Sequence, residues 1–459
     1  MRVYKSPLPV ILGMLLIASC FFACGGGEGR SPGTPVPVVI VPECSHCHGK
    51  DTADSHYDAK STKPLEGYVF DTAVAWAPEG MGYVLRTGEN ACAASCHSYH
   101  DGDISINNKW RTSGHADLRS DSFAYDFSDG SCLRCHSGVG FASYVDATNP
   151  EYPAWIPPSK EIYPHFITCN ACHDGEGYPT AKDKRLRKTG SVVLTSGNAA
   201  TFVQDALLDV GDSASCVVCH QGMESGWSLF RTMQSKGVDP YDGKDEVMTG
   251  ISFVNAHYAA AASMLFSRKG YEFSSRTYSK GLLLHQLPLC TGCHMAPAES
   301  QDLGGHSFNM RRNGYMNVAA CQSCHPGLTD FGTFFIYERD MDGDGMKESI
   351  KDEIEGLKEL LIGELENAGI YYNPHVYPYF FKVPAPQIYP NRVTIWKESQ
   401  LEAAFNLDFV AKEPGAYIHN FRYAVQLLRD SYEALTGRAL AGIRPSSSDD
   451  RPAAVYSSP

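Results

Sequence analysis

The chain has 459 residues, 20% of them charged, and a formal net charge of −13 at pH 7. This acidic balance argues against nucleic acid as a partner, because binding to phosphates needs basic patches. The chain also contains 16 cysteines and 17 histidines. A disulfide framework is typical of short secreted domains, so a chain of this length needs another explanation for its cysteines.

The first residues resemble an export signal. A positively charged start precedes an apolar stretch at 8–19, and Cys20 and Cys24 follow it in lipobox-like surroundings. Either cysteine is a candidate for lipidation, which would attach the protein to a membrane surface. An uncleaved membrane anchor is the alternative, although about 15 apolar residues are short for a span. We therefore assign 1–24 to a signal peptide and the Gly-, Pro- and Val-rich 25–42 to a flexible linker.

One motif recurs between residues 44 and 325. Six copies read C-x-x-C-H, and the copy at Cys92 has three residues between its cysteines. C-x-x-C-H is the attachment signature of haem c, in which two thiols bind the porphyrin and the adjacent histidine binds the iron. The predicted attachment cysteines are Cys44, Cys47, Cys92, Cys96, Cys132, Cys135, Cys169, Cys172, Cys216, Cys219, Cys290, Cys293, Cys321 and Cys324.

Two alternatives apply to these motifs. A single C-x-x-C-H could be half of a zinc site, but the chain has no complementary cysteine pairs that lack the histidine. For the irregular copy, Cys92 and Cys96 could instead form a disulfide or stay as free thiols beside His97. The sequence predicts seven haem c groups, one of them on a C-x-x-x-C-H motif.

Each haem iron has two axial positions, so the seven motif histidines need seven partners. The predicted proximal ligands are His48, His97, His136, His173, His220, His294 and His325. The predicted distal ligands are His56, His115, His165, His257, His285, His306 and His419. Of the three remaining histidines, His46 and His100 lie too close to their own motifs, and His375 is interpreted as a loop residue. An ordinary core or surface role is the alternative for each distal histidine.

Two histidine ligands leave no open position on an iron, so bis-histidine haems pass electrons without binding a substrate. With about 40 residues per haem, residues 43–325 are too few to build separate apolar cores. We therefore predict a mostly irregular fold with short α-helices and few or no β-strands, organised around a stacked haem chain. The alanine-rich stretch 255–266 is predicted to be a longer helix.

The C-terminal region, 326–443, contains no further motif and is predicted to be helical and packed on the haem core. Its start matches the first half of an EF-hand loop, which indicates a Ca²⁺-like site. The position for the bidentate glutamate holds Lys351, and a solvated acidic turn is the alternative. The predicted ligands are Asp340, Asp342, Asp344, Met346, Glu348 and Glu353.

Apolar periodicity predicts two helices in this region. One covers 350–368, and a second apolar stripe runs from Phe421 to Leu435 with His419 at its start. This second helix would bring His419 back toward a haem, where it could bind the iron. Residues 444–459, rich in Pro, Ser and Asp, are predicted to be disordered.

The chain resembles the multihaem c-type cytochromes of metal-reducing bacteria. The resemblance covers about residues 40–440 and rests on the seven motifs and on the contexts of His115, His257, His306 and His419. It implies electron transfer from the periplasm or outer membrane to external acceptors, with other redox proteins as partners. It also implies an exported protein at the outer membrane, at the cell surface or outside the cell, with the periplasm as the alternative, and it allows a homo-oligomer.

The main competing class is an enzyme. A multihaem reductase of a nitrogen or sulfur oxyanion keeps one haem five-coordinate beside groups that bind the anion. The number of histidines favours a non-enzymatic electron-transfer protein, because every iron can receive two of them.

The haem count is directly measurable. Pyridine haemochrome analysis combined with intact mass is expected to give seven haems per chain. Six haems would contradict attachment at Cys92 and Cys96, while the other six motifs would be unaffected.

Overall fold

The structure is a computed structural model. It describes residues 105–117, 120, 122, 132–146, 167, 169–173, 186–196, 203–281, 283–333, 339–446 and 450–452. The predicted signal peptide, the linker, the first two motifs and His165 lie outside these residues. The described residues thus contain the third to seventh motifs and most of the C-terminal region.

The elements are mostly short. Up to residue 294 they are α4 (Ser105–Arg111), η3 (Gly114–Ala116), α6 (Leu133–His136), α7 (Gly138–Asp146), α8 (Cys169–Cys172), β1 (Ser191–Ser196), β2 (Val203–Asp209), η5 (Gly211–Ser213), α9 (Ala214–Cys219), α10 (Gly226–Gln234), β3 (Val247–Thr249), α11 (Ala261–Leu265), β4 (Thr277–Ser279), α12 (Leu283–Gln286) and α13 (Leu289–His294). They continue with η6 (Gly305–Ser307), β5 (Arg311–Arg312), β6 (Tyr315–Met316), α14 (Ala319–Gln322), η7 (Phe331–Thr333), α15 (Ile350–Asn367), β7 (Tyr371–Tyr372), β8 (Phe380–Phe381), η8 (Tyr389–Asn391), β9 (Ile395–Lys397), α16 (Glu398–Ala411), α17 (Ala416–His419), α18 (Phe421–Thr436) and β10 (Asp450–Pro452).

The strands in the described residues form only two-stranded antiparallel sheets. These sheets pair β1 with β2, β3 with β9, β4 with β10, β5 with β6, and β7 with β8. The β1–β2 hairpin is the longest, with Ser191 opposite Asp209 and Ser196 opposite Val203. The predicted fold class, mostly irregular with short helices and few strands, is confirmed.

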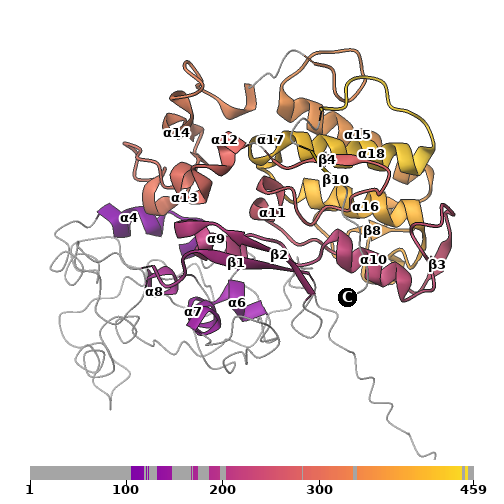
Figure 1. The fold of residues 1–459 in the computed structure, drawn as a ribbon, viewed down its shortest axis with the longest axis horizontal. Coiled ribbons are helices and arrows are strands. Elements are labelled where there is room, and N and C mark those ends of the chain that lie inside the picture. Colours follow the sequence, from indigo (N-terminus) through magenta and orange to yellow (C-terminus); the bar gives the residue numbers. More distant parts are fainter. Residues whose placement is uncertain are drawn as a thin grey trace, which may run out of the picture.

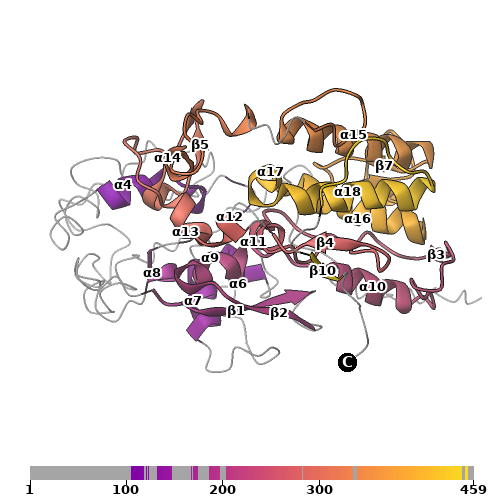
Figure 2. The same cartoon turned by 45° about the horizontal axis from the view of Figure 1, so that its top comes forward.

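The elements that carry the motifs and the long C-terminal helices gather in different parts of the molecule. In both views α4, α8, α13 and α14 lie toward one side, and α15, α16 and α18 lie together on the other (Figures 1 and 2). Helix α17 lies between these two groups, near α12 (Figures 1 and 2). The C-terminal helices are thus placed to support the motif region from one side.

Helix α15 has clear sequence signals at both ends. The Ser349 side chain accepts a hydrogen bond from the backbone N–H of Asp352 at 3.2 Å, which caps the first turn. Buried residues at helical spacing then form one face: Ile350, Ile354, Leu357, Leu361 and Leu365. The helix ends before Gly369, whose φ of +79° a residue with a side chain rarely adopts. The helix predicted at 350–368 is therefore confirmed.

Helices α15, α16 and α18 pack against one another and form the main apolar core. Helix α16 is buried nearly all round, with Leu401, Phe405 and Leu407 fully inaccessible. The Asn406 side chain lies in the same core and exchanges two hydrogen bonds with the backbone of Tyr271, at 2.8 and 2.9 Å. These bonds attach the C-terminal helices to the segment between the fifth and sixth motifs.

The helix predicted at 255–266 is largely wrong. Only α11, Ala261–Leu265, is helical there, and His257 has a left-handed φ of +73°. The Asn255 side chain accepts a hydrogen bond from the backbone N–H of His257 at 2.9 Å, which stabilises a turn in place of a helix. Alanine propensity is weak compared with such local bonding and with the surrounding tertiary structure.

The prediction of a disordered tail is wrong for 444–446 and 450–452. Strand β10 pairs with β4, and Arg444 makes two hydrogen bonds to the buried Asp430 carboxylate, both at 2.9 Å. A free sheet edge and a buried carboxylate thus order a segment of disorder-prone composition. Within the described residues no helix is both long enough and apolar enough to cross a membrane.

Leu361 and Leu360 offer a test of the C-terminal core. Leu361 is fully buried, whereas its neighbour Leu360 is 38% exposed. Leu361→Ala is expected to lower the free energy of unfolding by about 2–5 kcal/mol, since it leaves a cavity in the core. Leu360→Ala, the matched control, should change it by roughly 0.5 kcal/mol. Urea unfolding followed by circular dichroism measures both, and equal effects would contradict the assigned helix face.

Candidate functional site

Five C-x-x-C-H motifs lie within the described residues, and short helices hold most of their residues. These helices are α6, α8, α9, α13 and α14. In the seventh motif, the backbone N–H of His325 donates to the carbonyl of Cys321 at 2.8 Å. Such a turn brings the two thiols and the histidine of one motif close together, as attachment of one haem requires.

The histidines of these motifs each face one other histidine. Ten of the eleven histidines in the described residues form five pairs of rings, and each pair joins one predicted proximal ligand to one predicted distal ligand. The ring-centre distances are 5.9 Å for His136–His257, 6.3 Å for His173–His306, 6.1 Å for His115–His220, 6.2 Å for His294–His419 and 6.5 Å for His285–His325. The eleventh, His375, is exposed on a turn.

These separations fit two rings that bind one metal ion from opposite sides. A metal–histidine bond of about 2.0–2.1 Å, as in zinc sites, and roughly 1.1 Å from nitrogen to ring centre give a centre-to-centre distance of about 6.3 Å. The five pairs can therefore hold five haem irons with two histidines each.

Hydrogen bonds at Nδ1 orient four of the ten rings. His136 lies 2.6 Å from the Ser122 carbonyl, His285 2.8 Å from the Ile418 carbonyl, His294 2.9 Å from the Phe308 carbonyl, and His419 2.9 Å from the Glu413 carboxylate. When Nδ1 donates its proton, Nε2 keeps its lone pair for a metal. Ile418 and His419 are adjacent in α17, so this helix serves two histidine pairs.

Burial keeps two distal histidines neutral. It lowers the pKa of His115 to about 4, with smaller effects from His220 and His294, and it lowers the pKa of His257 to about 3, helped by His136 and Lys412. Neutral imidazole is the form that binds metal. In His419 burial also acts to lower the pKa, but the Glu413 carboxylate outweighs it and raises the pKa.

The motifs contact one another through their cysteines. The Cys135 side chain of the third motif lies beside that of Cys219 of the fifth, and Cys216 of the fifth lies beside Cys290 of the sixth. Cys172 of the fourth motif packs on the same apolar cluster as Cys219 and Cys290. Helix α13 of the sixth motif contacts α14 of the seventh. The spatial order therefore runs third, fifth, sixth and seventh, with the fourth beside the fifth.

Cys132 differs from the other attachment cysteines whose side chains are described. Its sulfur is disulfide-bonded, whereas the remaining eight thiols are free. A thioether to haem would use the same sulfur atom, so the disulfide and the attachment exclude each other. A count of six haems alone would therefore not show whether the motif at Cys92 or the motif at Cys132 lacks haem.

The remaining predicted site residues lie outside the described part of the chain. They are Cys20, Cys24, Cys44, Cys47, His48, His56, Cys92, Cys96, His97 and His165, and the side chain of Cys169 is not described either. Sequence reasoning missed Glu413 and Phe308. The Phe308 ring contacts the rings of His115 and His306, while its carbonyl accepts from His294. No fixed spacing from a motif could have identified either residue.

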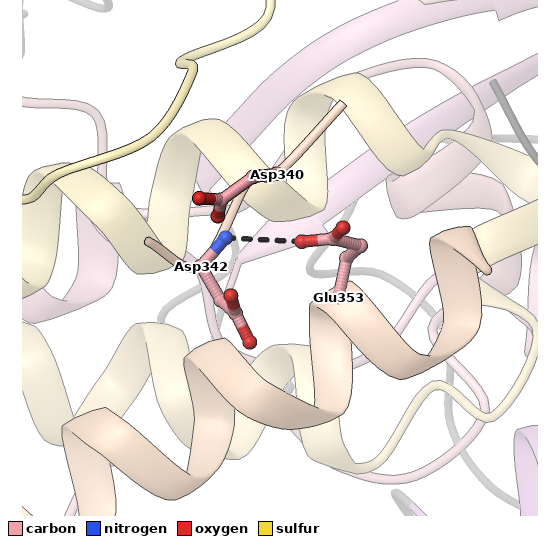
Figure 3. Close-up of side chains that lie close together, drawn as sticks. All are labelled: Asp340, Asp342 and Glu353. Carbon is pink, nitrogen blue, oxygen red and sulfur yellow. Dashed lines mark hydrogen bonds between the residues drawn. The ribbon is translucent and has the colours of Figure 1, made fainter. Parts of the chain in front are cut away.

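The predicted calcium loop brings carboxylates together (Figure 3). The ligand atoms of Asp340, Asp342 and Glu353 lie within 4.8 Å of one another, as do those of Asp342, Asp344 and Glu348. Glu353 also accepts hydrogen bonds from the backbone N–H groups of Met341 and Asp342, at 2.7 and 3.1 Å. The loop is therefore compatible with both alternatives, a Ca²⁺ site and an acidic turn that Glu353 stabilises.

Cysteine motifs on short helices and paired histidines at this spacing are compatible with a multihaem c-type cytochrome, the class that the sequence resembles. The chain is similar to C-type polyheme cytochromes of Geobacter sulfurreducens. It is 24% identical to OmcB over 520 aligned positions, covering 91% of this chain and 64% of OmcB. It is 23% identical to OmcC over 454 positions, covering 85% of this chain and 53% of OmcC.

The predicted resemblance is thus confirmed, and the chain spans less than two thirds of these relatives. Among solved structures it matches the outer cell wall cytochrome OcwA with a TM-score of 0.41 and 17% identity, over 72% of this chain and 50% of that one. No protein-family model matches the chain.

The calcium prediction is testable by thermal unfolding. At a free Ca²⁺ concentration 100 times Kd, binding is expected to stabilise the protein by about 2.7 kcal/mol. Asp342→Asn should reduce this gain, while Asp239→Asn, an exposed aspartate in another turn, should leave it unchanged. An unfolding temperature that does not respond to Ca²⁺ would favour the acidic turn.

The calcium effect should also depend on pH. Burial, reinforced by neighbouring carboxylates, raises the pKa of Asp342 to about 6. A raised carboxyl pKa means that ionisation disfavours the folded state, so without a cation stability falls as pH rises from about 4 through 6. The stabilisation by Ca²⁺ should therefore grow over the same pH range.

Proposed function

We propose that this protein is a non-enzymatic electron conductor with seven haem c groups, each iron held by two histidines. The observation that carries the proposal is the set of five ring pairs at 5.9–6.5 Å. Each pair contains one motif histidine and one histidine from elsewhere in the chain. The similarity to polyhaem c-type cytochromes supports the same class.

The pairs assign ligands to five haems. His257 is the distal ligand for the third motif (Cys132, Cys135 and His136), and His306 is the distal ligand for the fourth (Cys169, Cys172 and His173). His115 is the distal ligand for the fifth motif (Cys216, Cys219 and His220). His419 is the distal ligand for the sixth (Cys290, Cys293 and His294), and His285 for the seventh (Cys321, Cys324 and His325). His56 and His165 remain as the distal ligands for the first two motifs, with His48 and His97 as proximal ligands.

Bound haem supplies a one-electron carrier whose potential depends on its ligands and surroundings. Two histidines would hold each iron from opposite sides and would leave no position open to a substrate. The protein also buries the ligands, and it holds neighbouring motifs in contact through Cys135–Cys219 and Cys216–Cys290. These contacts support a row of closely spaced centres from the third motif to the seventh, with the fourth as a branch beside the fifth.

The location and partners follow from the sequence and are part of the proposal. An export signal with lipidation at Cys20 or Cys24 would attach the protein to the outer membrane or cell surface. There it would exchange electrons with other redox proteins or with extracellular acceptors. A homo-oligomer remains compatible with the spare His46 and His100.

The alternative is a multihaem reductase of a nitrogen or sulfur oxyanion. It requires one iron with an open position. All five described motif histidines face a second histidine. In this alternative the open iron would therefore belong to the first or second motif.

His306→Ala tests the ligand assignment. Removing this ring should convert one low-spin haem to a high-spin haem that binds carbon monoxide, because one axial position becomes open. EPR and the visible spectrum with carbon monoxide measure the change. His375→Ala, which removes an exposed histidine on a turn, is the control. An unchanged low-spin count in His306→Ala would contradict the pair His173–His306, and a carbon monoxide-binding haem in the wild type would favour the reductase.

A further inference from the structure

Among the four histidines whose Nδ1 contacts are given above, His419 has a different kind of partner. The Nδ1 atoms of His136, His285 and His294 meet backbone carbonyls, whereas Nδ1 of His419 lies 2.9 Å from Oε1 of Glu413. The Glu413 side chain is only 3% exposed. A buried carboxylate thus faces a ring that sits 6.2 Å from the proximal histidine of the sixth motif, His294.

The backbone fixes this contact. Oε1 of Glu413 also accepts a hydrogen bond from the backbone N–H of Gly415 at 3.0 Å, and the N–H of His419 donates to the Gly415 carbonyl at 2.8 Å. A Cβ atom at Gly415 would lie 2.7 Å from Cε1 of His419 and 2.9 Å from Oε1 of Glu413. The absence of a side chain at 415 therefore lets the carboxylate and the ring approach each other.

Lys412, the residue before Glu413, interacts with groups other than the Glu413 carboxylate. Lys412 lies 2.9 Å from the Asp408 carboxylate and 2.6 Å from the Asn255 side chain, and its ammonium also lies over the Tyr379 ring. Both Lys412 and Asp408 are fully buried. The Lys412 ammonium is therefore paired with Asp408 and not with Glu413.

We propose that Glu413 is a positioning residue that lowers the reduction potential of the sixth-motif haem relative to haems whose ligands donate to backbone carbonyls. A carboxylate attracts the Nδ1 proton more strongly than a carbonyl does and makes Nε2 a stronger donor to iron. A buried negative charge also stabilises the oxidised iron, because it is poorly screened. Both effects favour the ferric state. The inference rests on the proposed bis-histidine ligation of this haem by His294 and His419.

The test is a potentiometric titration of the full-length holoprotein, followed by EPR and visible spectroscopy. Glu413→Gln keeps the side-chain size but removes the charge and replaces the strong acceptor with a weaker one. One component of the titration is expected to move to higher potential, and the number of low-spin haems should not change. An unchanged set of potentials with an unchanged low-spin count would overturn the proposal and leave the ligation intact.

The matched control is Glu272→Gln. Glu272 is also 3% exposed, but its carboxylate accepts from the Tyr423 hydroxyl. This variant should leave every potential within experimental error of the wild type. A shift equal to that of Glu413→Gln would overturn the proposal, because any buried carboxylate would then suffice.

If Glu413→Gln changes the number of low-spin haems, two other variants test the role of Glu413. His419→Ala and His285→Ala should each remove one low-spin component from the titration of the wild type. The component lost in His419→Ala should have the lower potential, because the His285 ring donates to a carbonyl. The reverse order would overturn the role of Glu413. A full low-spin count in His419→Ala would instead contradict the proposed ligation itself.

Discussion

The pairing of imidazole rings from distant segments, at five places, is the constraint on which the described structure depends. Each described pair unites a histidine of a short motif helix with one from another segment, so the backbone between motifs must fold back to meet the rings. This requirement explains why the motif region is mostly irregular. Regular helices and sheets are found mainly where ordinary apolar packing is available, as in the C-terminal core of α15, α16 and α18.

Much of the site could be predicted from the sequence because its chemistry is local. Attachment of one haem needs two thiols and a histidine within a single turn, so the proximal ligands follow from spacing alone. Five of the seven predicted distal histidines lie in the described residues, and each forms a ring pair with a predicted proximal histidine. Helices α15 and α18 were also predictable, because each presents one apolar face to the core.

Other features depend on contacts between distant residues, and no local pattern encodes them. Helix α16 is buried nearly all round and so lacks the one-sided apolar pattern that predicts a helix. The turn at His257 forms because Asn255 competes with the helix, although alanines follow it. The pairing of the described histidines and the contact between Glu413 and His419 emerge only from the folded structure.

Helix α17 also has a consequence for the order in which the protein matures. A nascent chain emerges from its N-terminus, so residues near 419 are among the last to appear. The Ile418 carbonyl orients His285, and His419 faces His294. The sixth and seventh motifs thus precede the helix that completes the surroundings of both. One four-residue helix, late in the chain, therefore completes the contacts of histidines that belong to two neighbouring ring pairs.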